Sequence, residues 1–326
     1  MKLHEALNID LAEINREIGY LVERDKDVPK HSALARNILE LMGSGGKRLR
    51  PLLVVVGSRF GPKPVPRRTL QLAAASEFIH VASLVHDDII DRAEMRRGMP
   101  ALHMKTGITE AVHIGNYMSS RVIELLSKHA GDKNRYVHDL SAIATSQLCL
   151  GEYQQLNHAY DYDLTTEQYL DKSRNKTAML MATCLRVGAL AAESGNELAD
   201  RLYAFGEALG MAFQIQDDLL DFTQSADILG KPAGSDLKQG QVTLPVLFAL
   251  RDEKAAAVIR RIGPGSGEAE VEAALKAVTE SGALQQAEAV NRRYLDEAAA
   301  IAGELAGHPA ADDLQTLLHY FAGRDR

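Results

Sequence analysis

Two short acidic runs of identical spacing are the strongest indication of chemistry in this sequence. Each has two adjacent aspartates and a third one three residues further on: Asp87, Asp88 and Asp91 in the first, and Asp217, Asp218 and Asp221 in the second. In a helix, residues three and four apart share a face, so each run aims its carboxylates in one direction. Such charges repel unless cations hold them together, and Mg²⁺ suits oxygen ligands and is usually shared with substrate phosphates. The runs therefore predict a magnesium site for a phosphate-bearing substrate.

Basic residues accompany both acidic runs. Lys47, Arg48 and Arg50 follow the Gly45–Gly46 turn into a helix, where free backbone N–H groups also attract phosphate. Arg96 and Arg97 follow the first run, and Lys176 opens an apolar helix. Lys231 and Lys238 lie in the glycine-bearing loop after the second run. A diphosphate bound to Mg²⁺ needs this mixture of carboxylates and cations.

The composition excludes several classes of protein. With 326 residues, 46% of them hydrophobic, the chain can bury a sizeable core, and its net charge of −7 gives no footprint for nucleic acid. No apolar run approaches the roughly 18 residues of a membrane span, and the N-terminus has no signal-peptide core. Cys149 and Cys184 stand alone in apolar helical patterns, which predicts two buried thiols in a reducing compartment. We expect a soluble, cytoplasmic protein without a transmembrane segment.

The pattern of apolar residues indicates which elements position the acidic runs. Helical spacing recurs across nearly the whole chain, and no run alternates as a strand would. Glycine and proline breaks separate roughly a dozen helices. None of the breaks is long or polar enough for an interdomain linker, and a joint site needs both runs in one bundle. We expect an all-α fold, a single domain over residues 1–326, with the helices around a central cavity.

The order of these motifs resembles that of the trans-isoprenyl diphosphate synthases. The resemblance covers essentially the whole chain and rests on GGKRLRP, HVASLVHDDIIDRAEMRRG, KTA, FQIQDDLLDF and GKPAGSDLKQGQVTLP. It implies an isoprenoid synthase fold and Mg²⁺-dependent head-to-tail condensation of isopentenyl diphosphate onto an allylic diphosphate. Within the family, SDLKQGQVTLPVLFAL and the ending from Tyr320 to Arg326 are similar to the large catalytic component of heptaprenyl diphosphate synthases. That similarity implies a heptaprenyl product, with a menaquinone side chain as its expected use.

The resemblance also implies roles for individual residues. Both acidic runs, Asp221 included, would bind three Mg²⁺ ions around the allylic diphosphate. The residues that would face the allylic diphosphate, or the carbocation formed from it, are Arg96, Lys176, Thr177, Gln214 and Lys231. Lys176, Thr177 and Gln214 would be the catalytic ones among them. The residues that would bind isopentenyl diphosphate are Lys47, Arg50, His80 and Arg97.

The helix before the first run is implied to measure the product. In this family the product grows down that helix, so Ala82, Ser83 and Ile79 would form or line its floor. Ala82 and Ser83 are small, whereas an aromatic ring in their place would stop growth early. From Asp87 to Gln71 is about 16 residues, or ~24 Å of helix, enough depth for a long prenyl tail. The resemblance therefore predicts a long-chain product.

Several alternatives remain open. The chain could be a shorter-chain homodimeric synthase for geranylgeranyl or farnesyl diphosphate, a class I terpene cyclase, or a non-catalytic partner subunit. The absence of Trp, the 5% aromatic content and the matching second run disfavour a cyclase. Two positions depart from the family pattern: Gln241 stands where many homodimeric members have lysine, and Asn116 replaces a frequent aspartate. We expect a dimer, either a homodimer or a heterodimer with a small non-catalytic subunit, and transient membrane contact during product release.

Each site residue also has a purely structural interpretation. His80 could be a satisfied core histidine, and Asp221 could support its neighbours without binding metal. Lys176 and Thr177 could be only the start of a helix. The small residues of the expected floor could be small because helices approach closely there.

Overall fold

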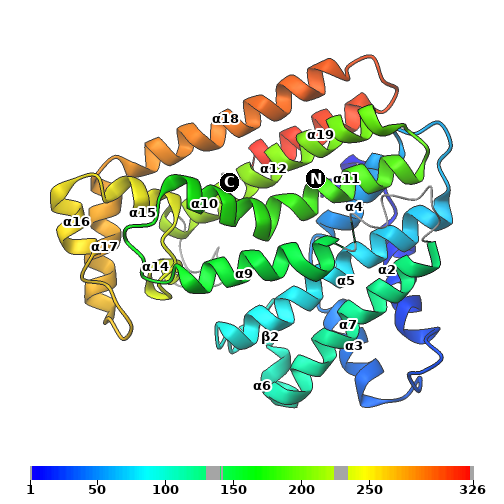
Figure 1. Ribbon diagram of the computed structural model, residues 1–326, viewed down its shortest axis with the longest axis horizontal. Helices are drawn as coiled ribbons and strands as arrows, with labels where there is room; N and C mark the ends of the chain where they lie inside the picture. The colour runs from blue at the N-terminus through cyan, green and yellow to red at the C-terminus, as the bar shows by residue number, and fades with distance from the viewer. Residues whose placement is uncertain (1, 130–139, 141, 224–233, 324–326) are drawn as a thin grey trace.

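The computed structural model describes residues 2–129, 140, 142–223 and 234–323, and helices make up most of it (Figure 1). The all-α prediction is confirmed. A short antiparallel hairpin, β1 (Met95–Arg96) and β2 (Met99–Pro100), follows the first acidic run. Its two-residue turn has positive φ at Arg97 (54°) and Gly98 (77°), the geometry that matches the twist of a tight hairpin. Strands of two residues are too short to leave an alternating pattern in the sequence.

The helices range from single turns to rods that cross the molecule. In chain order they are α1 (Leu3–Ala6), α2 (Leu11–Glu23), α3 (Ala33–Gly43), α4 (Leu49–Ser58), α5 (Pro66–Ile90), α6 (Leu102–Thr106), α7 (Ile108–His129), η1 (Ile143–Gln147), α9 (Leu148–Asn157), α10 (Thr166–Ser173), η2 (Arg174–Ala178), α11 (Met179–Ala191), α12 (Asn196–Thr223), α14 (Ser235–Lys238), α15 (Leu244–Ala249), α16 (Glu253–Ile259), α17 (Glu268–Glu280), α18 (Ala283–Glu304) and α19 (Ala311–Ala322). The turns η1 and η2 are π-helical. The two acidic runs lie at the C-terminal ends of α5 and α12, which are the longest of the described helices.

Glycines allow the helices that carry the site to pack closely. The helices α4, α11, α12 and α18 lie side by side in that order (Figure 1). A Cβ added at Gly57 of α4 would lie 2.1 Å from the backbone oxygen of Leu185, and one at Gly188 of α11 would lie 2.1 Å from that of Val54. Any side chain at these two positions would therefore force α4 and α11 apart. This contact fixes α11, and with it η2, relative to the turn that precedes α4.

Two buried apolar clusters lie along the same long helix. The larger includes Ile14, Leu52 and Phe78, and the smaller lies where α15, α16 and α17 gather at one end of the molecule (Figure 1). Helix α12 contributes Phe205 to the larger cluster and Ile215 to the smaller one. Both ends of the molecule are therefore packed on α12, the helix that carries the second acidic run.

Three predictions can be compared directly with the fold. Cys184 is buried as expected, but Cys149 is exposed on α9, and both thiols are free. Lys176 and Thr177 do not open a helix, because they lie in η2, where one helical run continues from α10 into α11. Throughout the described ranges, no helix is both long enough and apolar enough to cross a membrane.

Candidate active site

The three aspartates of the first acidic run differ in their surroundings. Asp88 is buried and accepts a hydrogen bond from Arg96 Nε at 2.8 Å. Asp87 is also buried, but its Oδ1 has no hydrogen-bond partner, and Asp91 is exposed at the end of α5. Burial raises the pKa of Asp87 to about 7, although the charge of Lys176 opposes that rise. A buried carboxylate oxygen without a donor is a position where a cation fits.

Asp218, in the second run, is held by hydrogen bonds. It accepts one from Tyr169 Oη at 2.6 Å and one from Gln214 Nε2 at 2.9 Å. Burial raises its pKa to about 7, and the nearby charge of Lys172 and these two hydrogen bonds oppose the rise. Tyr169 of α10 and Gln214 of α12 therefore hold the carboxylate of Asp218 in one orientation.

Asp221 supports the segment that follows the second run. It has no exposed surface, and it accepts hydrogen bonds from Ser235 Oγ at 3.1 Å and from the backbone N–H of Asp236 at 3.3 Å. These contacts place its carboxylate at the first turn of α14, where a negative charge is favourable. The supporting role considered from the sequence matches this geometry, and a metal-binding role for Asp221 stays a prediction. Asp217, beside it on α12, is half-buried.

The π-helical turn η2 connects the two runs. Lys176 Nζ lies 2.8 Å from Glu152 Oε1, and its charge also interacts with Asp87. The next residue, Thr177, donates a hydrogen bond to Gln214 Oε1 at 2.7 Å. Lys176 thus interacts with the first run, and Thr177 is linked through Gln214 to the second run. Wide π-helical turns of this kind are frequent at functional sites. The structure brings Lys176, Thr177 and Gln214 together between the two runs.

A second group of cations gathers around the turn before α4. The residues expected to bind isopentenyl diphosphate come from separate parts of the chain: Lys47, Arg50, His80 and Arg97. Arg97 donates a hydrogen bond to the backbone oxygen of Gly45. Burial lowers the pKa of His80 well below its ordinary value, and the charges of Arg50 and Arg97 lower it further. A neutral histidine therefore lies within charge range of both arginines.

The cations of the turn itself point in different directions. Arg48 is buried and forms an ion pair with Glu77 of α5 at 2.9 Å, so its expected place among the phosphate-binding cations is wrong. Lys47 is exposed, with Nζ 5.9 Å from the centre of the Tyr320 ring on α19. Arg50 has a buried Nε without a hydrogen-bond partner. Arg48 supports the turn, whereas the other two remain available to a ligand.

The residues expected to limit product length lie inside the molecule. Ile79 and Ala82 are buried, and Ser83 is partly buried with its hydroxyl donating to the backbone oxygen of His80 at 2.8 Å. These positions agree with a floor below the first run, and they agree equally with close helix packing.

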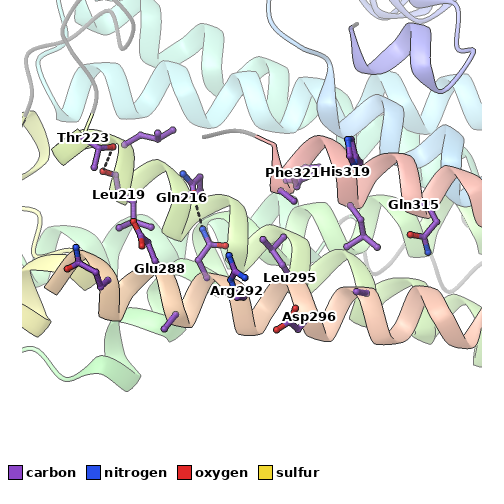
Figure 2. A pocket seen from close by; sticks show the side chains of 17 residues that line it. Gln216, Leu219, Thr223, Glu288, Arg292, Leu295, Asp296, Gln315, His319 and Phe321 are labelled. Atoms are coloured by element: carbon purple, nitrogen blue, oxygen red, sulfur yellow. Dashed lines mark hydrogen bonds between the residues drawn. The ribbon is translucent and has the colours of Figure 1, made fainter. Parts of the chain in front are cut away.

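A cavity of about 1040 Å³ lies between α12, α18 and α19, and on α12 it is lined by residues adjacent to the aspartates of the second run (Figure 2). Gln216 and Leu219 of α12 line it, and Gln216 Oε1 accepts a hydrogen bond from Asn291 Nδ2 at 2.6 Å (Figure 2). None of the residues assigned to the site from the sequence lines this cavity. It is therefore a different space from the central cavity that the sequence predicts.

Three residues at the site were missed from the sequence: Glu152, Tyr169 and Lys172. Lys172 is buried, with Nζ 5.2 Å from the centre of the Tyr169 ring. Its spacing of four residues from Lys176 is a signal that could have placed both on one helical face. Glu152 and Tyr169 gave no such signal, because their partners lie 24 and 49 residues away in the chain.

The remaining predicted positions contribute less to the geometry. Lys231 lies outside the described residues. Asn116 is exposed on α7, and Lys238 is exposed at the end of α14. The backbone N–H of Gln241 donates to the backbone oxygen of Asp236 at 2.8 Å, so this departure from the family pattern adjoins the segment held by Asp221.

The surroundings of the first run fit an open metal site shared with a substrate. Across the described ranges, no three His, Cys, Asp or Glu side chains are grouped so that they could hold a metal ion by themselves. Mg²⁺ bound to a diphosphate needs only one or two carboxylates, because waters and phosphate oxygens complete its shell. The unpartnered oxygen of Asp87 and the exposed carboxylate of Asp91 supply that number.

A helical bundle that joins two aspartate runs to two groups of cations fits an enzyme that acts on diphosphates with divalent metal ions. Residues 31–280 match the family model described as polyprenyl synthetase. The chain is 39% identical over 323 residues to heptaprenyl diphosphate synthase component 2 of Geobacillus stearothermophilus, covering 99% of this chain and 98% of that protein. The chain belongs to the polyprenyl synthetase family and is a trans-prenyl diphosphate synthase, a prenyltransferase.

Solved structures agree with this assignment. The fold is similar to that of a heptaprenyl diphosphate synthase from Staphylococcus aureus, with a TM-score of 0.89, 32% identity and coverage of 100% of this chain and 99% of the other. It is also similar to a polyprenyl synthase from Caulobacter crescentus CB15 complexed with calcium and isoprenyl diphosphate, with a TM-score of 0.87, 33% identity and coverage of 100% and 98%.

Proposed function

We propose that this chain is a long-chain trans-polyprenyl diphosphate synthase that makes heptaprenyl diphosphate, for use as a menaquinone side chain. Identities of 39% and 32% to heptaprenyl synthases support this product length without fixing it. The observation that carries the proposal is the small, buried Ala82 on α5, below the unpartnered oxygen of Asp87. A growing chain that starts at the first run would meet no large side chain at this position. We further propose that residues 1–326 act as one domain, since α12 packs in both apolar clusters.

The allylic diphosphate is proposed to bind between the two runs together with Mg²⁺, three ions in all. Calcium in the Caulobacter crescentus complex supports a divalent ion. The residues proposed to hold the metal are Asp87, Asp88 and Asp91 of the first run and Asp217 and Asp218 of the second, with Asp221 as a predicted further ligand. When bound, the metal withdraws electron density from the diphosphate and favours its departure. Arg96 and Lys176 add positive charge beside the first run, as Lys231 is predicted to do.

The second diphosphate site is proposed around the turn before α4. Lys47, Arg50, His80 and Arg97 would bind isopentenyl diphosphate there. The buried, unpartnered Nε of Arg50 is a charged donor available to a phosphate oxygen. The charges of Arg50 and Asp217 interact, which supports a site close to the second run. The two substrates would then lie next to each other.

The condensation itself would need no protein nucleophile. The allylic C–O bond breaks, the isopentenyl double bond attacks the carbocation, and the proton that is lost goes to the released diphosphate. Thr177 and Gln214 would present oxygen atoms to the carbocation. Their hydrogen bond of 2.7 Å, and the bond of 2.9 Å from Gln214 to Asp218, hold these oxygens in place before substrate arrives.

A partner component is proposed for the active enzyme. The relative from Geobacillus stearothermophilus is named a component 2, which supports a heterodimer with a small non-catalytic subunit. Large apolar side chains are exposed on α7, at Ile108 and Ile123, and on α9, at Leu150 and Tyr153. We propose that the small subunit covers apolar side chains of these two helices, with a homodimer as the alternative outcome.

The direct test incubates the purified chain with farnesyl diphosphate, isopentenyl diphosphate and Mg²⁺, alone and with the small component, and sizes the products. We expect heptaprenyl diphosphate when both components are present. Absence of condensation in both mixtures, with the chain folded, would contradict the proposed function. Products that stop at geranylgeranyl diphosphate would contradict only the long-chain assignment.

Replacing Ala82 with Phe tests the position of the floor. We expect A82F to shorten the product to farnesyl or geranylgeranyl diphosphate, because the ring would fill the helical turn below the first run. Thin-layer or mass-spectrometric sizing of the products measures the change. The control S83A keeps a small side chain and should leave the length unchanged. An unchanged length in A82F would place the floor elsewhere.

A further inference from the structure

The ammonium group of Lys176 interacts with two groups of carboxylates. It contacts Glu152 of α9, 2.8 Å from Oε1 and 3.0 Å from Oε2, and donates to Gln155 Oε1 at 3.1 Å. Its charge also interacts with Asp87 and Asp91 of the first acidic run. Burial lowers the pKa of Lys176, but the charges of Asp87 and Glu152 outweigh burial and raise it. Lys176 therefore interacts electrostatically with both groups of carboxylates, and it forms an ion pair with Glu152.

A close approach of α9 to η2 makes this contact independent of the first run. A Cβ added at Gly151 would lie 2.7 Å from the backbone nitrogen of Lys176, so the two backbones nearly touch. Beside this point, Asn175 Nδ2 donates to Gln154 Oε1 at 3.0 Å. Glu152 is thus held opposite Lys176 by the close packing of the two backbones, and this hydrogen bond lies beside the contact.

Besides Glu152, the opposite charges that act on Lys176 belong to Asp87 and Asp91 of the first acidic run. Asp87 has a buried oxygen without a partner, and the charges of Lys176 and Glu152 act on both Asp87 and Asp91. A lysine ammonium on its flexible stem can rotate to a new partner. An ion pair between Lys176 and Asp87 would occupy the carboxylate that a divalent ion needs.

We propose that Glu152 is a positioning residue that pairs with the ammonium of Lys176, prevents it from forming an ion pair with Asp87, and so keeps Asp87 and Asp91 available to a divalent metal ion. The inference rests on the proposed function, in which the first run binds metal. Glu152 acts here through Lys176 and is not itself a ligand.

Binding of Mn²⁺ to the full chain without substrate, followed by the electron paramagnetic resonance signal of free Mn²⁺, tests this role. We expect E152Q to weaken Mn²⁺ binding about tenfold, the lower end of what partners of metal ligands contribute. K176Q should bind Mn²⁺ at least as well as the wild type, and E152Q should have no further effect when combined with K176Q. The matched control N175A removes a hydrogen bond between the same two segments without touching Lys176, and should bind normally. Circular dichroism checks folding, and E152A serves as a second variant.

The outcomes separate this inference from the proposed function. If D87N loses Mn²⁺ binding while E152Q and E152A bind like the wild type, the positioning role is overturned and the metal site stands. An equal loss from E152Q in the K176Q background would also overturn it, because Glu152 would then act on the metal directly. If the wild type does not bind Mn²⁺, the inference fails, since it requires a site formed before substrate. Unchanged binding in D87N would contradict the proposed metal site itself.

Discussion

The two acidic runs share one spacing but lie in opposite surroundings. In the first run, Asp87 has an oxygen without a hydrogen-bond partner and Asp91 is exposed. In the second run, Asp218 accepts two hydrogen bonds and Asp221 is fully buried against α14. The first run leaves carboxylate oxygens available to a ligand, whereas the second uses several to hold α10 and α14 against α12. Spacing along a helix sets the direction of the carboxylates, and tertiary neighbours set their availability.

The largest effect should come from neutralising one carboxylate in each run and comparing the two variants. We expect D87N to lower kcat by about 10²–10³-fold, because an electrostatic contribution to the departing diphosphate is removed. D221N should lower kcat by less than about tenfold and instead reduce the free energy of unfolding by about 1–3 kcal/mol, since it disturbs a buried acceptor. Steady-state condensation assays with saturating Mg²⁺ and urea unfolding measure both. Equal losses of kcat in the two variants would remove the contrast between the runs.

A smaller effect should follow from releasing Asp218 without changing its charge. Y169F removes the 2.6 Å hydrogen bond, and we expect about a tenfold loss of activity, as for other partners of metal ligands. The same substitution should have no further effect in a D218N background. The control Y162F removes a tyrosine hydroxyl that donates to the backbone oxygen of Ile262, at 2.9 Å, and should be nearly silent. An equal loss in Y162F would indicate general destabilisation.

The smallest effect concerns how the free energy of unfolding of the metal-free protein changes with pH. Burial raises the pKa of Asp87 to about 7, above its unfolded value of about 3.9, so between these pH values the folded chain binds more protons. The contribution of Asp87 to stability is therefore present below about pH 4 and is lost as pH rises to about 7. We expect D87N, in EDTA, to become more stable than the wild type over this range, by about 1–3 kcal/mol at pH 8.

Thermal unfolding of both proteins at a series of pH values measures this difference. Addition of Mg²⁺ and inorganic diphosphate should reverse it, because these ligands bind the ionised carboxylate and stabilise only the wild type. If the difference in stability between D87N and the wild type did not change with pH, the raised pKa of Asp87 would not be its cause.

The sequence predicted well those features that depend on nearby residues. Helical periodicity gave the all-α fold, and the spacing within each run gave the shared direction of its carboxylates. Predictions that depended on distant neighbours were less secure. Arg48 belongs by spacing with Lys47 and Arg50, but Glu77, on another helix, draws it into the interior. Cys149 lies in an apolar pattern and is nevertheless exposed.

The residue types of the two runs, their spacing and the accompanying cations were determined by the sequence alone, because a helix relates residues three and four apart in a fixed way. Only the tertiary structure decided which carboxylates keep a free oxygen and which cation faces which run. Glu152 and Lys176 meet because a glycine lets two backbones nearly touch, and Tyr169 reaches Asp218 because α10 packs on α12. Such contacts join residues that local periodicity does not relate, so their partners appear only once the chain is folded.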